Sequence, residues 1–147
     1  MAKGDQLYFK ALKEARNKRP KWQVVQAQLE RASGLGNGKA IYALSTWYLH
    51  GQVYRRDLKK AVELLNLACD KNIPEAHFDL AICLEKGKGV KKNLREAFLH
   101  YLKACRLGDK DAAYEVGRCY YYGLGVKADK EIGRIWLNGF KEKGSES

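Results

Sequence analysis

The stretch that decides the fold is residues 76–111, which read AHFDLAICLEKGKGVKKNLREAFLHYLKACRLGDKD. It aligns without a gap with residues 40–75, AIYALSTWYLHGQVYRRDLKKAVELLNLACDKNIPE, and with the segment from residue 112, AAYEVGRCYYYGLGVKADKEIGRIWLNGFKEKG. The alanines that open the three segments, Ala40, Ala76 and Ala112, are spaced at 36 residues. A fixed period of this length is typical of proteins built from stacked structural repeats.

Each 36-residue unit predicts two helices. In the first predicted helix of the unit at 40–75, Ala40, Leu44 and Tyr48 recur at the spacing of one helical face. A glycine then occupies the same place in each unit and is expected to end this helix, because glycine tolerates the left-handed backbone of a helix end: Gly51, Gly87 and Gly123. An Asp or Asn precedes the second apolar run, where its side-chain oxygen can cap a helix: Asp57, Asn93 and Asp129.

The turn motif carries a family resemblance. Gly87-Lys88-Gly89-Val90 and Gly123-Leu124-Gly125-Val126 resemble the turn of the Sel-1-like repeat, a relative of the tetratricopeptide repeat. The resemblance implies an all-α fold, a right-handed α/α solenoid of about four helix-turn-helix repeats. We expect a single domain over residues 1–147, with a degenerate N-terminal capping hairpin at 4–39 and repeats at 40–75, 76–111 and 112–147. The sequence departs from the family at Ser45 and Ala81, where glycine is favoured, and at Gly133, where alanine is favoured.

The composition is that of a folded, strongly basic protein. Of its 147 residues, 46% are hydrophobic and 31% charged, and 28 Lys and Arg against 17 Asp and Glu give a net charge of +11. Basic residues gather near the turns between the paired helices, so stacking would align them as a basic ridge: Arg55, Arg56, Lys59, Lys88, Lys91, Lys92 and Lys127. Three interpretations stay open: a solvated edge, steering of an acidic protein partner, or weak attraction to nucleic acid.

The sequence offers no catalytic constellation. The four cysteines (Cys69, Cys83, Cys105 and Cys119) follow the repeat period without a CxxC pair, so we expect reduced thiols packed in the core. His50, His77 and His100 show no metal-ligand spacing and are interpreted as structural. The glycine turns lack the GxxxxGK[ST] pattern of phosphate loops. We therefore predict a non-enzymatic protein with no cofactor and no metal.

The first helices are expected to carry the partner-binding surface. In tetratricopeptide relatives these helices line the concave face, and the resemblance transfers its inward positions by register from Leu44. A face turned away from the core is expected to be polar, yet this one holds several aromatic rings, which is typical of a contact surface. The alternative is that tight curvature buries the rings against each other. The predicted residues are Tyr42, Thr46, Leu49, His50, Phe78, Ile82, Lys86, Tyr114, Arg118, Tyr121 and Tyr122.

These features together predict an adaptor or scaffold that binds another protein, one with an acidic surface or segment. The alternative is a small immunity or inhibitor protein that neutralises a bacterial toxin or effector, and a basic nucleic-acid-binding solenoid is less favoured. No apolar run approaches the roughly 20 residues of a membrane span, so membrane insertion is not expected. We expect a cytoplasmic monomer, or a periplasmic one if a signal peptide has been removed.

Overall fold

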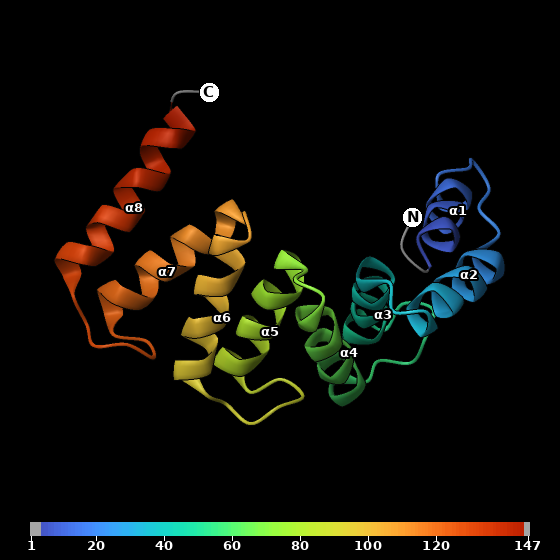
Figure 1. Cartoon of the computed structure of the whole chain (residues 1–147). Helices are drawn as coiled ribbons and strands as arrows, with labels where there is room; N and C mark the ends of the chain where they lie inside the picture. Colours follow the sequence, from blue (N-terminus) through green and yellow to red (C-terminus); the bar gives the residue numbers. More distant parts are fainter. Residues whose placement is uncertain (1–3, 146–147) are drawn as a thin grey trace. The chain divides into compact units, whose positions relative to one another are not determined.

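The computed structural model describes the backbone of residues 4–145 and the side chains of residues 4–139. The chain divides into two compact units, Met1–Ile73 and Pro74–Ser147, and each contains four helices in the described range (Figure 1). No strand occurs between residues 4 and 145, so the predicted all-α class is confirmed. In the same range, no helix is long and apolar enough to cross a membrane.

The first unit contains two helical hairpins. Helix α1 (Asp5–Ala15) packs against α2 (Trp22–Gly34), and α3 (Gly38–His50) packs against α4 (Leu58–Asp70). Helix α2 also packs against α3, which joins the hairpins. Asn37 fixes the junction, because its side chain caps α3 at the Ala40 amide (2.8 Å) and donates a hydrogen bond to the Asp5 carboxylate of α1 (2.8 Å).

The second unit repeats this arrangement. Helix α5 (Pro74–Lys86) pairs with α6 (Leu94–Arg106), α7 (Lys110–Tyr122) pairs with α8 (Lys130–Ser145), and α6 packs against α7. Small residues on α6 let the paired backbones approach, since Ala97 and Ala104 are almost completely buried. Helix α6 also supplies the bulky Phe98 and Tyr101 to the core.

The predicted helix boundaries are confirmed at both ends of the turns. Gly51, Gly87 and Gly123 follow α3, α5 and α7 with left-handed φ angles of 71°, 71° and 73°. Each predicted capping oxygen accepts a backbone amide at 3.0 Å near the start of α4, α6 or α8: Asp57 from Lys60, Asn93 from Glu96, and Asp129 from Ile132. The division of residues 1–147 into a capping hairpin and three repeats stays a prediction.

The four cysteines form no disulfide, as the sequence predicts, and all four lie within the described residues. Cys69, Cys83 and Cys119 are buried, and Cys105 is half-buried. Burial raises the pKa of the Cys119 thiol to about 11. The neutral thiol is therefore the form that packs in the core at neutral pH.

Candidate partner-binding surface

The eleven residues predicted to bind a partner, here called the first-helix face, lie on α3, α5 and α7. None of them is fully buried. Four are exposed: His50, Lys86, Tyr114 and Tyr122. The other seven are half-buried: Tyr42, Thr46, Leu49, Phe78, Ile82, Arg118 and Tyr121. The structure therefore leaves these side chains partly or fully open to solvent, while their role in binding stays a prediction.

The aromatic rings of this face differ in how far they are exposed to solvent. The Phe78 ring meets the Tyr101 ring edge-on at 5.7 Å. Tyr121 lies beside α8, with Lys130 Nζ 5.5 Å and the Arg134 guanidinium carbon 6.0 Å from its ring centre. In contrast, Tyr114 is 45% exposed and Tyr122 is 67% exposed. The Tyr122 ring packs edge-on against the Tyr121 ring at 4.9 Å, so packing of the rings against each other coexists with substantial exposure of Tyr114 and Tyr122.

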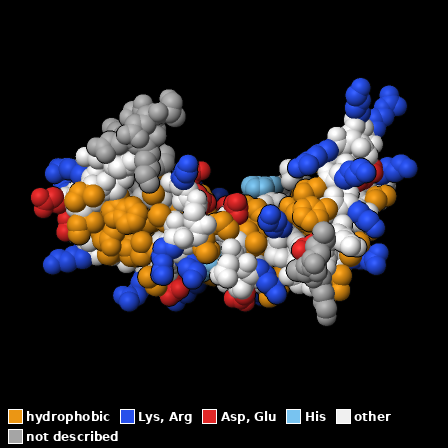
Figure 2. Space-filling model, turned by 45° about the horizontal axis from the view of Figure 1, so that its top comes forward, with side chains coloured by type: hydrophobic (Ala, Val, Ile, Leu, Met, Phe, Trp, Pro, Cys, Tyr) orange, Lys and Arg blue, Asp and Glu red, His pale blue; other side chains and the backbone are white. Residues whose placement is uncertain are grey.

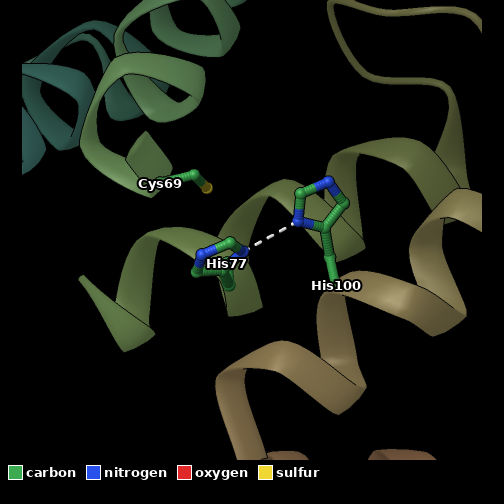
Figure 3. Close-up of side chains that lie close together, drawn as sticks. All are labelled: Cys69, His77 and His100. Carbon is green, nitrogen blue, oxygen red and sulfur yellow. Dashed lines mark hydrogen bonds between the residues drawn. The ribbon is translucent and has the colours of Figure 1, made fainter. Parts of the chain in front are cut away.

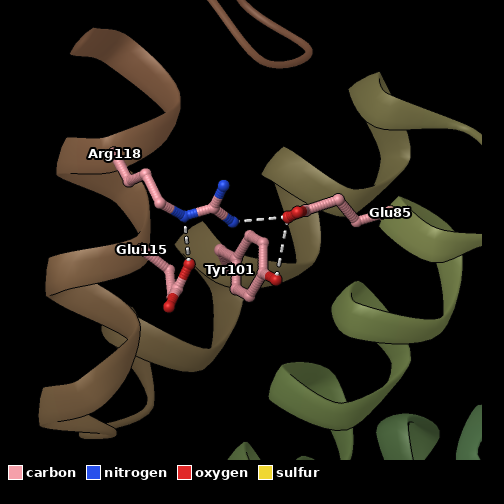
Figure 4. A network of polar contacts seen from close by, with 4 residues as sticks. All are labelled: Glu85, Tyr101, Glu115 and Arg118. Atoms are coloured by element: carbon pink, nitrogen blue, oxygen red, sulfur yellow. Dashed lines mark hydrogen bonds and ion pairs between the residues drawn. The ribbon is translucent and has the colours of Figure 1, made fainter. Parts of the chain in front are cut away.

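A polar clasp joins α5 to α7 on the same face (Figure 4). Arg118 of α7 donates through Nη2 to Glu85 Oε1 at 2.6 Å and through Nε to Glu115 Oε2 at 2.7 Å. The hydroxyl of Tyr101, from α6, donates to the same Glu85 oxygen at 3.1 Å. We call these four residues the clasp. It ties three consecutive helices of the second unit together.

The clasp sets the charge states of its members. Burial alone lowers the pKa of the Arg118 guanidinium, but hydrogen bonds and negative charge from Glu85 and Glu115 outweigh burial and raise it. Burial, followed by the charges of Glu85 and Glu115, raises the pKa of Tyr101 above its usual range. Tyr101 therefore remains a hydrogen-bond donor and Arg118 a cation. The guanidinium of Arg118 already bonds Glu85 and Glu115. This residue therefore stabilises the packing of α5 and α7.

The basic ridge residues are all exposed. Arg55 and Arg56 lie in the turn between α3 and α4, and Lys59 follows in the first turn of α4. Lys88, Lys91 and Lys92 lie in the turn before α6, and Lys127 lies in the turn before α8. Figure 2 shows Lys and Arg side chains around the visible face, with fewer Asp and Glu side chains among them. The basic side chains at these turns are therefore accessible to solvent.

Two histidines meet where α5 packs against α6 (Figure 3). His77 is 6% exposed, and its Nδ1 lies 2.9 Å from Nδ1 of half-buried His100. Burial lowers the pKa of His100, partly offset by the charge of Glu96, which favours a neutral ring. One ring donates the shared hydrogen and the other accepts it. The structural interpretation of these two residues stays a prediction, while His50 is exposed at the end of α3.

Sequence reasoning missed the clasp, although signals for it exist. Glu115 and Arg118 are three residues apart on one helix, a spacing at which opposite charges meet. Glu85 and Arg118 lie on α5 and α7, the two first helices of the second unit, and they carry opposite charge. Tyr101 gives no such signal, because its core position is set by the packing of α6.

Comparison with known proteins agrees with this architecture. The Sel1 repeat family matches residues 38–73, 74–109 and 110–138. Chitin synthase regulatory factor 3 of Schizosaccharomyces pombe is 34% identical over 112 residues, which cover 74% of this chain but 12% of that protein. The chain thus spans about an eighth of the length of this relative.

Solved structures resemble the chain over nearly its full length. A Sel1 repeat protein from Oxalobacter formigenes superposes with a TM-score of 0.87 at 23% identity, covering 96% of this chain and 59% of that one. An immunity protein from Pseudomonas aeruginosa superposes with a TM-score of 0.62 at 25% identity, covering 97% of this chain and 53% of that one. The predicted α/α solenoid class is confirmed.

Proposed function

Because the chain belongs to the Sel1 repeat family, whose repeats mediate protein–protein interaction, we propose that it is a non-enzymatic module that binds a partner protein through the first-helix face. Its likeness to a regulatory factor of chitin synthase supports a role that is exerted on another protein. The proposal assigns no cofactor and no catalytic residue to the chain.

The observation that carries the proposal is the exposure of Tyr114 and Tyr122 on α7. Tyrosine is enriched among residues that dominate binding energy, because it offers a large apolar ring and a hydroxyl with few rotatable bonds. Both side chains leave water when a partner covers α7.

The basic ridge supports the finer proposal that the partner presents acidic groups beside the turns. A net charge of +11 accelerates encounter with a negatively charged surface. We place the protein, acting as a monomer, in the cytoplasm. The exposed ridge residues also attract phosphate, so a nucleic acid is the competing ligand that the binding experiments have to include.

An inhibitory role is the second candidate. It is favoured by the structural likeness to an immunity protein over 97% of this chain. In this version the partner is a toxin or effector protein, and binding blocks its activity. An adaptor leaves the activity of its partner unchanged or delivers the partner to another protein, so an activity assay on the captured partner separates the two roles.

The test compares partner capture by the wild-type chain and by a Tyr114→Ala, Tyr122→Ala variant. Partners are identified by pull-down and mass spectrometry, and affinity is then measured with the purified partner. We expect the variant to bind at least about 30-fold more weakly, as for loss of a binding hot spot, with its melting temperature nearly unchanged. The matched control is Leu99→Ala, which shortens an exposed apolar side chain on α6. Equal binding by variant and wild type would contradict the proposal.

A further inference from the structure

A pocket of about 380 Å³ opens on the first-helix face of the second unit. Phe78 of α5 lines one side, and Asp111, Tyr114 and Glu115 of α7 line the other. Asp111 and Glu115 are four residues apart, so they lie on the same side of α7, one turn from each other. The pocket thus combines two carboxylates with two aromatic rings. Its volume lies at the small end of ligand pockets, about 300–1,000 Å³, which suits a single side chain.

The two helices that line this pocket carry a net charge opposite in sign to that of the whole protein. Helices α5 and α7 carry five acidic residues (Glu75, Asp79, Glu85, Asp111 and Glu115) against three basic ones (Lys86, Lys110 and Arg118). These two helices thus contribute a charge of −2 to a chain whose net charge is +11. The Arg118 guanidinium forms ion pairs with Glu85 and Glu115 in the clasp. It therefore does not neutralise the charge of the Asp111 carboxylate.

The neighbouring helix cap experiences this negative environment. Asp109 precedes α7 and accepts hydrogen bonds from the Asp111 and Ala112 amides. Burial raises the pKa of Asp109, and the charges of Asp111 and Glu75 raise it further, against the lowering by these two hydrogen bonds. A cation placed between α5 and α7 would relieve the repulsion among these carboxylates.

We propose that the pocket receives an arginine side chain of the partner protein, an inference that rests on the proposed function. A guanidinium is planar, stacks on aromatic faces and forms paired hydrogen bonds with carboxylates. Phe78 and Tyr114 supply the faces, and Asp111 and Glu115 supply the acceptors. Glu115 bonds Arg118 through Oε2, and a carboxylate can accept on both of its oxygens.

Other occupants fit this chemistry less well. A phosphate or an acidic side chain would be repelled by Asp111 and Glu115. An aliphatic side chain would remove water from two carboxylates without replacing their hydrogen bonds, which is costly. A lysine ammonium supplies the charge but not the plane that stacks on a ring. The partner therefore meets two surfaces of opposite sign, the basic ridge at the turns and this acidic pocket on the first helices.

The test uses nuclear magnetic resonance of the full ¹⁵N-labelled chain, titrated with Nα-acetyl-arginine methylamide. The two comparison compounds are its citrulline analogue, which has nearly the same shape but no charge, and its lysine analogue. We expect saturable shifts of the Phe78 and Asp111–Glu115 amides at millimolar arginine compound, the affinity range of a single side chain. Binding should be about tenfold weaker or more with the citrulline analogue, and intermediate with lysine.

Asp111→Asn should weaken binding of the arginine compound by about fivefold or more, since it removes one charged acceptor. Glu131→Gln is the matched control, because it removes an exposed negative charge from α8 of the same unit. Absence of localised shifts, equal shifts with citrulline, or an unchanged affinity of Asp111→Asn would each overturn the inference. None of these results would affect the proposed function, which is tested by the loss of partner binding in the tyrosine variant.

Discussion

Replacing Gly125 by alanine should destabilise the protein much more than the same change at Gly87. The two glycines have nearly equal left-handed φ angles, +74° and +71°, so the backbone cost of adding a Cβ is similar, about 1–2 kcal/mol. Their surroundings differ. A Cβ at Gly87 would lie 3.5 Å from the Lys92 Cβ, an ordinary contact, whereas a Cβ at Gly125 would lie 2.0 Å from the Leu94 carbonyl oxygen.

The magnitude follows from what that Cβ would displace. Its nearest neighbours are the backbone oxygen and carbonyl carbon of Leu94 and the amide nitrogen of Arg95, at 2.0, 2.5 and 2.9 Å. These atoms belong to the first turn of α6 and cannot rotate away as a side chain can. Forcing a methyl group into a packed contact costs about 1–3 kcal/mol. We therefore expect Gly125→Ala to lose about 2–5 kcal/mol of unfolding free energy, and Gly87→Ala about 1–2.

The assay is urea denaturation of both variants and wild type, followed by circular dichroism at the helix band. The difference in unfolding free energy between the two variants measures how tightly the turn between α7 and α8 packs against the start of α6. This packing contact also positions Lys127 relative to the basic residues that precede α6. Equal losses in the two variants would refute the argument, because the backbone cost alone would then account for both.

Two further predictions concern the first unit. Val53 has a left-handed φ of 58° and is 52% exposed. Val53→Gly should therefore raise the unfolding free energy by about 0.5–1 kcal/mol in urea denaturation, whereas Val53→Ala should not. A lower unfolding free energy for the glycine variant would contradict this. Burial and a hydrogen bond to Glu30 raise the pKa of Tyr54 to about 12, from 10.0. The unfolded chain therefore loses this proton first, so stability present below pH 10 falls as the pH rises to about 12. The unfolding free energy of Tyr54→Phe should fall less steeply with pH between 10 and about 12. The same slope in the variant and the wild type would exclude this linkage.

The sequence predicts the helices well because their determinants are local. Asp57, Asn93 and Asp129 each cap the helix that follows, since a capping oxygen needs only a backbone amide three residues away. Pro74 begins α5, a position where its missing amide hydrogen costs nothing. The 36-residue register then carries the same assignment from one repeat to the next, which is why few residues are needed to place all the hairpins.

One departure from the family pattern, Gly133, is explained by a contact between two helices and not by the local sequence. At Gly133 the family favours alanine, but a Cβ there would lie 2.8 Å from the Tyr121 amide nitrogen. Helix α8 thus approaches α7 too closely for a side chain at this point. The clasp has the same origin, since Glu85 and Arg118 are 33 residues apart. The 36-residue register does not give the distances between neighbouring helices. It therefore does not predict which side chains of one helix contact the next.

Net charge alone leads to an incomplete view of the partner. The value of +11 predicts an acidic partner, and the exposed Lys88, Lys91 and Lys92 in the turn before α6 contribute to this charge. The first helices of the same unit carry the opposite sign around Asp111. Salt screens exposed charges more strongly than partly buried ones. Added salt should therefore slow association at the turns, while a cation seated between Phe78 and Tyr114 is less affected. If both proposals hold, specificity would come from the pocket, and the rate of encounter would come from the ridge.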